Sequence, residues 1–187
     1  MEEKDKQIDL KREKLEVGVY YEDKEYAGLT KRVIIIGVDI FILVILWASI
    51  IIIWEMTNDD IEEIPVYLTY IGVSLAYIYL VVFRMFTVGT LGNILTKTKV
   101  VDLRGNRPSL FQMTIRFLML ILGPINFLLD FFWLTGDPYK QTLRDKFAAT
   151  YVINKQAVPL GQGLQTFSTY QIFGMSFVFR EVKKNNK

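Results

Sequence analysis

A single carboxylate, Asp39, lies inside a long apolar stretch of the sequence. Val33 to Trp54 form a run of 22 residues in which Asp39 carries the one charge. A carboxylate at the centre of a membrane-spanning helix costs roughly 2.5 to 3.5 kcal/mol on insertion scales. Two roles would offset this cost. Asp39 either pairs with a cationic side chain and joins two helices, or it binds a cation or a proton in a cavity that faces the cytoplasm.

Two arginines are candidate partners of Asp39. Arg32 precedes Asp39 by seven residues, so the two share a helix face, but they lie roughly 10 Å apart along the axis. Arg84 comes near the end of a second apolar stretch, residues 64–86. Because the second helix would run back toward the start of the first, Arg84 and its long side chain are better placed to reach Asp39.

A second intramembrane ion pair is expected in a third apolar stretch, residues 111–134. Arg116 lies seven residues before Gly123, and Asp130 lies seven residues after it. The dipeptide Gly123-Pro124 is typical of a turn or a kink. If the stretch folds there, Arg116 and Asp130 reach a similar depth and can pair.

The composition excludes most catalytic chemistry. The sequence contains no histidine and no cysteine, which removes the usual general base, the usual transition-metal ligand and the thiol nucleophile. Ser49 and Ser74 lie inside apolar stretches without an evident base. We therefore expect no enzyme activity, no metal site and no cofactor. The net charge of +2 gives no argument for nucleic-acid binding.

The distribution of charge predicts the membrane topology. Helices at about residues 31–54 and 64–86 are each long enough to cross a bilayer, and the first lacks the short apolar region of a cleaved signal. The loop between them, residues 55–63, has five acidic residues and no basic one. Basic residues gather beyond the other ends of these helices, at Lys31, Arg32, Lys97, Lys99, Arg104 and Arg107. Because lysine and arginine accumulate on the cytoplasmic side, we expect a cytoplasmic N-terminus. We separately expect the location to be a bacterial cytoplasmic (inner) membrane.

The third apolar stretch, residues 111–134, favours a re-entrant or interfacial hairpin. The segment that follows it is basic again, with Lys140, Arg144 and Lys146. A single crossing would place that segment outside, against the charge rule. A tilted third span is the alternative.

The predicted fold is an all-α integral membrane protein. It has two transmembrane helices, a Gly-Pro-broken re-entrant or third membrane helix at 111–134, and a short cytoplasmic β-hairpin near Gly105. We expect a charged cytoplasmic N-terminal segment at 1–25, a membrane domain at 26–154 and an aromatic tail at 155–187. The tail is too polar for a further span, and its spacing of aromatic residues fits a strand or a helix.

Three separated segments resemble the RDD family of small membrane proteins, which is named for one arginine and two aspartates. These segments are the first helix with Arg32 and Asp39, the loop "TVGTLGNILTKTKVVDLRGNRPSL", and "DPYKQTLRDKFAAT" with Asp145. The resemblance covers roughly residues 26–154. It implies Arg32, Asp39 and Asp145 as the family motif and a possible ion or interhelix site, with Arg84, Arg116 and Asp130 as supporting charges.

The sequence departs from the family pattern in the loop. Members often have a Pro-Gly-Lys-Arg-like stretch before the strand, whereas this chain has Leu91, Gly92, Asn93 and Ile94. The loss of two basic positions weakens any role that needs them, such as binding a lipid headgroup. Asp145 has two interpretations: a helix-start cap or surface ion pair, or a cytoplasmic closure that contacts Arg32.

Two functions remain from different classes. The first is a small integral membrane scaffold or accessory subunit that associates with other membrane proteins, or with itself, through its helices and tail. The second is possible transport, by an oligomeric cation or proton transporter or antiporter that uses Asp39. Two spans and a hairpin are few for a pathway, so transport would need an oligomer.

Overall fold

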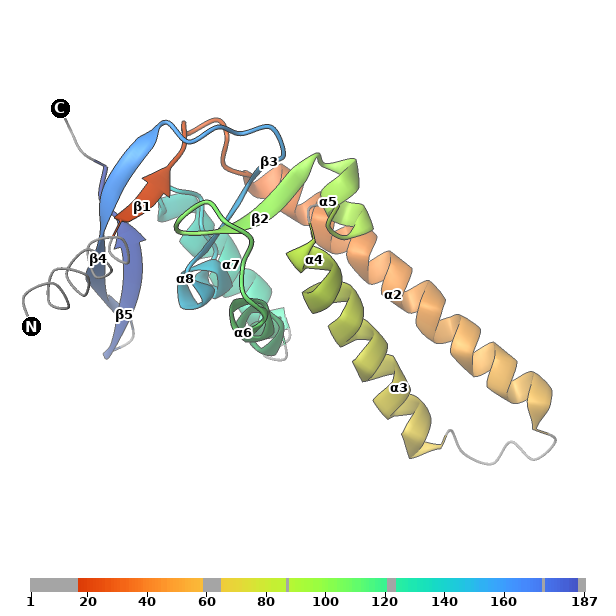
Figure 1. Ribbon diagram of the computed structural model, residues 1–187. Coiled ribbons are helices and arrows are strands. Elements are labelled where there is room, and N and C mark those ends of the chain that lie inside the picture. The colour runs from red at the N-terminus through yellow and green to blue at the C-terminus, as the bar shows by residue number, and fades with distance from the viewer. Residues whose placement is uncertain (1–16, 59–64, 87, 121–123, 173, 185–187) are drawn as a thin grey trace, which may run out of the picture.

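The protein consists of two long helices that project from a mixed helix-and-strand body (Figure 1). This computed structural model describes residues 17–58, 65–86, 88–120, 124–172 and 174–184. Predictions for residues 1–16, for most of the acidic loop and for the turn at Gly123 lie outside these ranges.

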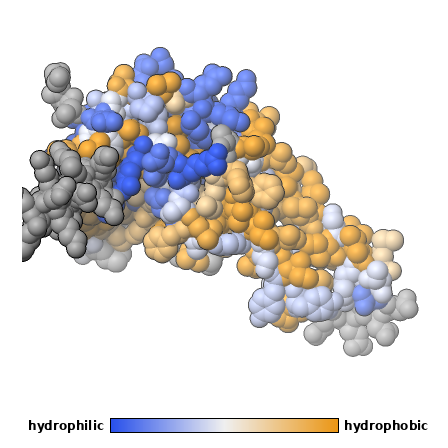
Figure 2. Space-filling view, in the orientation of Figure 1, coloured by the Kyte–Doolittle hydropathy of each residue, from blue (hydrophilic) through white to orange (hydrophobic). Residues whose placement is uncertain are grey.

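The projecting helices match the two predicted spans. Helix α2 is Leu29–Thr57. Helix α3, Val66–Tyr77, continues through a π-helical turn, Ile78–Val82 (η1), into α4, Phe83–Met85. Both are long and apolar enough to cross a membrane. Their apolar side chains cover the surface of this part of the molecule (Figure 2).

The third apolar stretch forms two short helices. Helix α6 is Leu110–Leu120 and helix α7 is Pro124–Gly136. At about 1.5 Å per residue, each is about 17 to 20 Å long, short of the roughly 30 Å hydrocarbon core. Helix α7 begins at Pro124, as expected from the rigid backbone and missing N–H of proline at a helix start. Both helices pack against α8, Leu143–Ala148.

The prediction of an all-α protein is wrong. The structure is 53% helical and 22% strand, with two antiparallel sheets. Strands β2, Thr98–Asp102, and β3, Thr150–Asn154, form one sheet. Strands β1, Val17–Tyr20, β4, Gly161–Ile172, and β5, Met175–Val182, form the other in the order β1-β4-β5.

The predicted local hairpin near Gly105 is also wrong. A tight turn is present, because Gly105 donates its N–H to the Asp102 carbonyl at 3.0 Å and has φ +80°. The chain does not return along β2 after this turn. Strand β2 pairs instead with β3, with Val100 opposite Val152. Such a distant pairing has no local sequence signal.

The aromatic tail is a β-hairpin that packs on the body. Trp133 on α7 and Phe147 on α8 each contact Phe179 on β5, with ring centroids 5.6 and 5.0 Å apart. Strand β4 also pairs with β1, so the tail and the N-terminal strand share one sheet. The alternation of Phe177 and Phe179 therefore belongs to a strand.

Candidate functional site

A cluster of buried charges lies where the projecting helices meet the body. Its side chains come from α2, α4, α6, α7 and α8, which brings together segments far apart in the sequence. All of its members are at most 8% exposed: Arg32, Arg84, Arg116, Arg144, Asp39, Asp130 and Asp145. Four arginines thus face three aspartates. The cluster contains every residue that the sequence nominated for the site, together with Arg144.

Asp39 is fully partnered. It is 1% exposed. Its Oδ2 accepts hydrogen bonds from Arg84 Nη2 at 2.5 Å and Thr90 Oγ1 at 2.9 Å. Its Oδ1 accepts from the Tyr79 hydroxyl and the Gly92 N–H, both at 3.0 Å. The expected ion pair between Asp39 and Arg84 is therefore present, and three neutral donors complete the shell.

The π-helical turn explains how one helix supplies two of these donors. Tyr79 and Arg84 are five residues apart, which would place them about 140° apart around an ordinary α-helix of 3.6 residues per turn. In η1 the Phe83 N–H bonds the Ile78 carbonyl, five residues back. A π-helical turn is wider than an α-helical turn, because each N–H bonds the carbonyl five residues back. Tyr79 and Arg84 therefore lie closer to one face of the helix, and both reach Asp39.

The remaining donors come from the start of the segment that departs from the family pattern: Gly92 lies in this segment, and Thr90 directly precedes it. Helix α5, Leu91–Leu95, begins beside Asp39. A Cβ added to Gly92 would lie 2.5 Å from the Ile35 carbonyl oxygen. Only glycine therefore allows the backbone N–H to come close enough to bond Asp39. The Thr90 hydroxyl also lies 2.8 Å from Asn93 Oδ1, so its single proton is shared between Asp39 and Asn93.

Asp145 is the centre of a second network. It is 0% exposed. Arg32 Nη1 lies 2.6 Å from its Oδ2, and Arg116 Nη1 bonds its Oδ1. It also closes a capping box with Thr142 at the start of α8. Asp145 thus takes part in the helix-start cap and also contacts Arg32, and it is buried instead of forming a surface ion pair.

Arg32 and Arg116 each make further bonds in this network. Arg32 Nη2 donates to the Lys140 carbonyl at 2.7 Å, and Arg116 Nη1 donates to Thr150 Oγ1 at 2.6 Å. Burial alone would raise the pKa of Asp145, but the guanidinium groups of Arg116, Arg32 and Arg144 hold it well below its usual range. Asp145 therefore stays ionised and keeps α2, α6 and α8 together.

The predicted pair between Arg116 and Asp130 is wrong. Arg144 Nε lies 2.9 Å from Asp130 Oδ2, and Arg116 turns to Asp145. The prediction assumed that the stretch 111–134 folds on itself. Instead α8 packs against both α6 and α7 and provides the partner for each charge. Burial raises the pKa of Asp130, although Arg144 opposes the shift.

A further network of buried ion pairs, centred on Lys146, escaped the sequence reasoning. Lys146 on α8 is 2% exposed and bonds both Asp137 and Glu181. Burial alone would raise the pKa of Glu181, but bonds from Lys146 and Tyr170 lower it. In the sequence analysis Lys146 served only as one of the basic residues that mark the cytoplasmic side. Its contact with Glu181 depends on the fold of the tail, which no local pattern reveals.

Comparison with known proteins accounts for the motif residues. The sequence pattern of the RDD family matches residues 26–149. The chain belongs to the RDD family. No curated protein and no solved structure matches. The resemblance seen in the sequence is thus confirmed.

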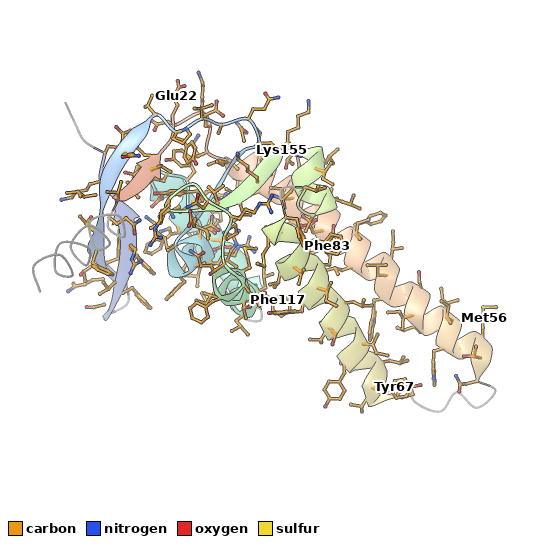
Figure 3. All side chains as sticks on the ribbon, in the orientation of Figure 1. Glu22, Met56, Tyr67, Phe83, Phe117 and Lys155 are labelled. Carbon is orange, nitrogen blue, oxygen red and sulfur yellow. The ribbon has the colours of Figure 1, made fainter. Side chains whose placement is uncertain are left out.

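The RDD match and the two apolar helices identify a membrane protein. Asp39 is the last buried residue of α2, so the remaining 18 residues leave the body. They extend about 27 Å, close to the roughly 30 Å hydrocarbon core. Met56 and Tyr67 lie at the far end of the helix pair, and Phe83 lies near the body (Figure 3). Asp39 is therefore placed where the apolar part of α2 leaves the body. Among the described residues there is no group of three acidic, histidine or cysteine side chains that could hold a metal.

Proposed function

We propose that this RDD protein is a non-catalytic membrane scaffold or accessory subunit, which joins a larger assembly through its two apolar helices. The observation that carries the proposal is the complete partnering of Asp39. Its two oxygens accept four hydrogen bonds, one of them from the cationic guanidinium of Arg84. The carboxylate is thus committed to holding α2, α4 and α5 together.

The same geometry argues against Asp39 as a cation site. A cation at Asp39 would have to replace the guanidinium of Arg84, which lies 2.5 Å away. It would also lie near three further buried arginines, which repel it. Transport of a cation or proton by an oligomer remains the second candidate, and it has less support.

The space between the helices supports a docking role. An apolar groove of about 380 Å³ lies between α2 and α3, lined among others by Val44, Trp47 and Val73. Trp47 packs directly on Gly72, where an added Cβ would lie 2.1 Å from its ring. In membranes, small residues such as glycine let helices approach closely. The groove is suited to a helix of another membrane protein or of a second copy.

The membrane orientation is part of the proposal. The acidic segment faces the outside, and the N-terminus and the sheet-containing body face the cytoplasm of a bacterium, with the protein in the inner membrane. This orientation follows the positions of lysine and arginine. In this arrangement the charged body is available to cytoplasmic parts of the assembly.

The test combines cross-linking with mass measurement. The chain has no cysteine, so single cysteines can be placed at Val44 and Val73 in the groove. Phe41, which is 63% exposed on α2, provides the control position. After cross-linking in membranes and gentle solubilisation, we expect discrete higher-mass products from the groove positions and none from Phe41. Equal products from all three positions, or none from any, would contradict docking in the groove.

A flux measurement separates the two functions. The purified protein is reconstituted into vesicles, and sodium-dependent proton movement is followed with a pH-sensitive dye. The scaffold proposal expects no flux above empty vesicles. Flux that Asp39→Asn abolishes while leaving the protein folded would favour the transporter.

A further inference from the structure

The four buried arginines line a common cavity. Arg32, Arg84, Arg116 and Arg144 come from four different helices, and Asn93 adds an amide. The rest of the wall is apolar, including Ile35 and Val152. Each arginine pairs outward with an aspartate, yet none of the three aspartates lines the cavity.

Charge and hydrogen bonding both leave this cavity electropositive. The four arginines and the three aspartates of the cluster carry a net charge of +1. Buried Nε groups of Arg84 and Arg116 have no hydrogen-bond partner within the protein. Unsatisfied buried donors are costly, most of all when they are charged. An anion in the cavity would compensate both the charge and the donors.

The size of the cavity restricts the ligand. Its volume is about 20 Å³, and roughly 10 to 15 Å³ suffices for one water molecule. A phosphate or a carboxylate-bearing metabolite is too large. We propose that this cavity binds a single small monovalent anion of the halide class, with chloride as the physiological ligand, and that the bound anion stabilises the junction between the helices and the body.

Stability in different salts tests the proposal. The purified full-length protein in detergent is unfolded by heat in sodium chloride, sodium bromide or sodium gluconate at constant ionic strength. A ligand that binds the native state raises its stability in a saturable way. We expect the Tm to rise by a few degrees as chloride or bromide replaces gluconate, and to level off. An equal Tm in all three salts would overturn the proposal.

A matched pair of variants locates the site. Asn93→Asp places a carboxylate in the cavity with little change of shape, so it should abolish the chloride dependence. Asn106→Asp adds the same charge at an exposed turn and should leave the dependence unchanged. Chloride dependence that survives Asn93→Asp would show that the anion binds elsewhere.

If Asn93→Asp does not fold, anomalous scattering from wild-type crystals grown in bromide tests the site directly. A bromide peak among the four arginines supports the site, and bromide sites only on the surface contradict it.

Discussion

The two motif aspartates hold the molecule together in different ways. Asp39 meets one arginine and three neutral donors, whereas Asp145 meets two arginines directly and caps its own helix. Asp39 lies where α2 leaves the body, and Asp145 lies inside the body. The comparison teaches that a carboxylate with a single cationic partner can be satisfied by added backbone and hydroxyl donors, while the one inside the body compensates two buried cations.

The largest loss of stability is expected for Asp145→Asn. Removing its charge leaves Arg32 and Arg116 buried without a counter-ion. Breaking a buried ion pair costs about 3 to 5 kcal/mol, and we expect the upper part of this range because two cations are affected. Chemical unfolding in detergent would measure it. Asp23→Ala, which removes an exposed pair with Lys184, is the control and should change stability by less than about 1 kcal/mol.

A smaller loss is expected for Asp39→Asn. One arginine, Arg84, loses its counter-ion, while the amide still accepts from some of the neutral donors. We expect about 3 kcal/mol, the lower end of the range for a broken buried pair. Adding Arg84→Gln should recover part of this loss, since the unpaired charge is then removed. If Asp39→Asn costs as much as Asp145→Asn, the contrast between the two networks fails.

The sequence predicts one of these networks much better than the other. The pair of Asp39 and Arg84 follows from two antiparallel spans, whose length and apolar character fix the depth of each charge. Contact of Asp145 with Arg32 was one of two interpretations of the sequence. Its second partner, Arg116, depends on α8 packing against α6, and this packing has no periodic or local signal. The error with Arg116 and Asp130 arose in the same way, because symmetry about Gly123 was a weaker constraint than the packing of α8.

The pairing of the strands also could not be predicted from local sequence patterns. A short hairpin was expected near Gly105, but the strand before this turn pairs with β3, nearly fifty residues further along the chain. The donors Tyr79 and Thr90 were missed because they reach Asp39 only through a π-helical turn and the start of α5. A π-helical turn has no sequence signature that could have predicted it.

Double-mutant cycles would test whether Arg116 pairs with Asp145 or with Asp130. Arg116 and Asp145 are in direct contact, so their coupling free energy should be about 0.5 to 3 kcal/mol. The same cycle for Arg116 and Asp130 should give less than about 0.5 kcal/mol, as expected for residues without a shared bond. Stronger coupling for Arg116 with Asp130 would restore the pairing expected from the sequence.

The pH dependence of stability should differ between wild type and Asp145→Asn. In the folded protein the pKa of Asp145 is lowered below its ordinary value of 3.8. The contribution of Asp145 to the free energy of unfolding is therefore fully present above about pH 4, its pKa in the unfolded chain. This contribution is lost as the pH falls toward its pKa in the folded protein. The difference in unfolding free energy between the two proteins should be constant from pH 8 to about pH 5 and shrink below about pH 4. A difference that shrinks already near neutral pH would mean that Asp145 is not held ionised by its arginines.

The smallest effect is expected for Tyr79→Phe, which tests whether neutral donors matter in the Asp39 network. The substitution removes the hydroxyl that donates to Asp39 Oδ1 and accepts from the Leu91 N–H at 3.1 Å. The Gly92 N–H still bonds the same oxygen, so the carboxylate keeps a donor on each side. A hydrogen bond to a charged group contributes about 1.5 to 3 kcal/mol when it is lost outright, and the remaining donor should hold the loss to about 1 kcal/mol. Tyr70→Phe on the same helix, where the side chain is 69% exposed, is the matched control and should have no measurable effect. A loss for Tyr79→Phe as large as that for Asp39→Asn would mean that the hydroxyl, and not Arg84, is the main partner of the carboxylate.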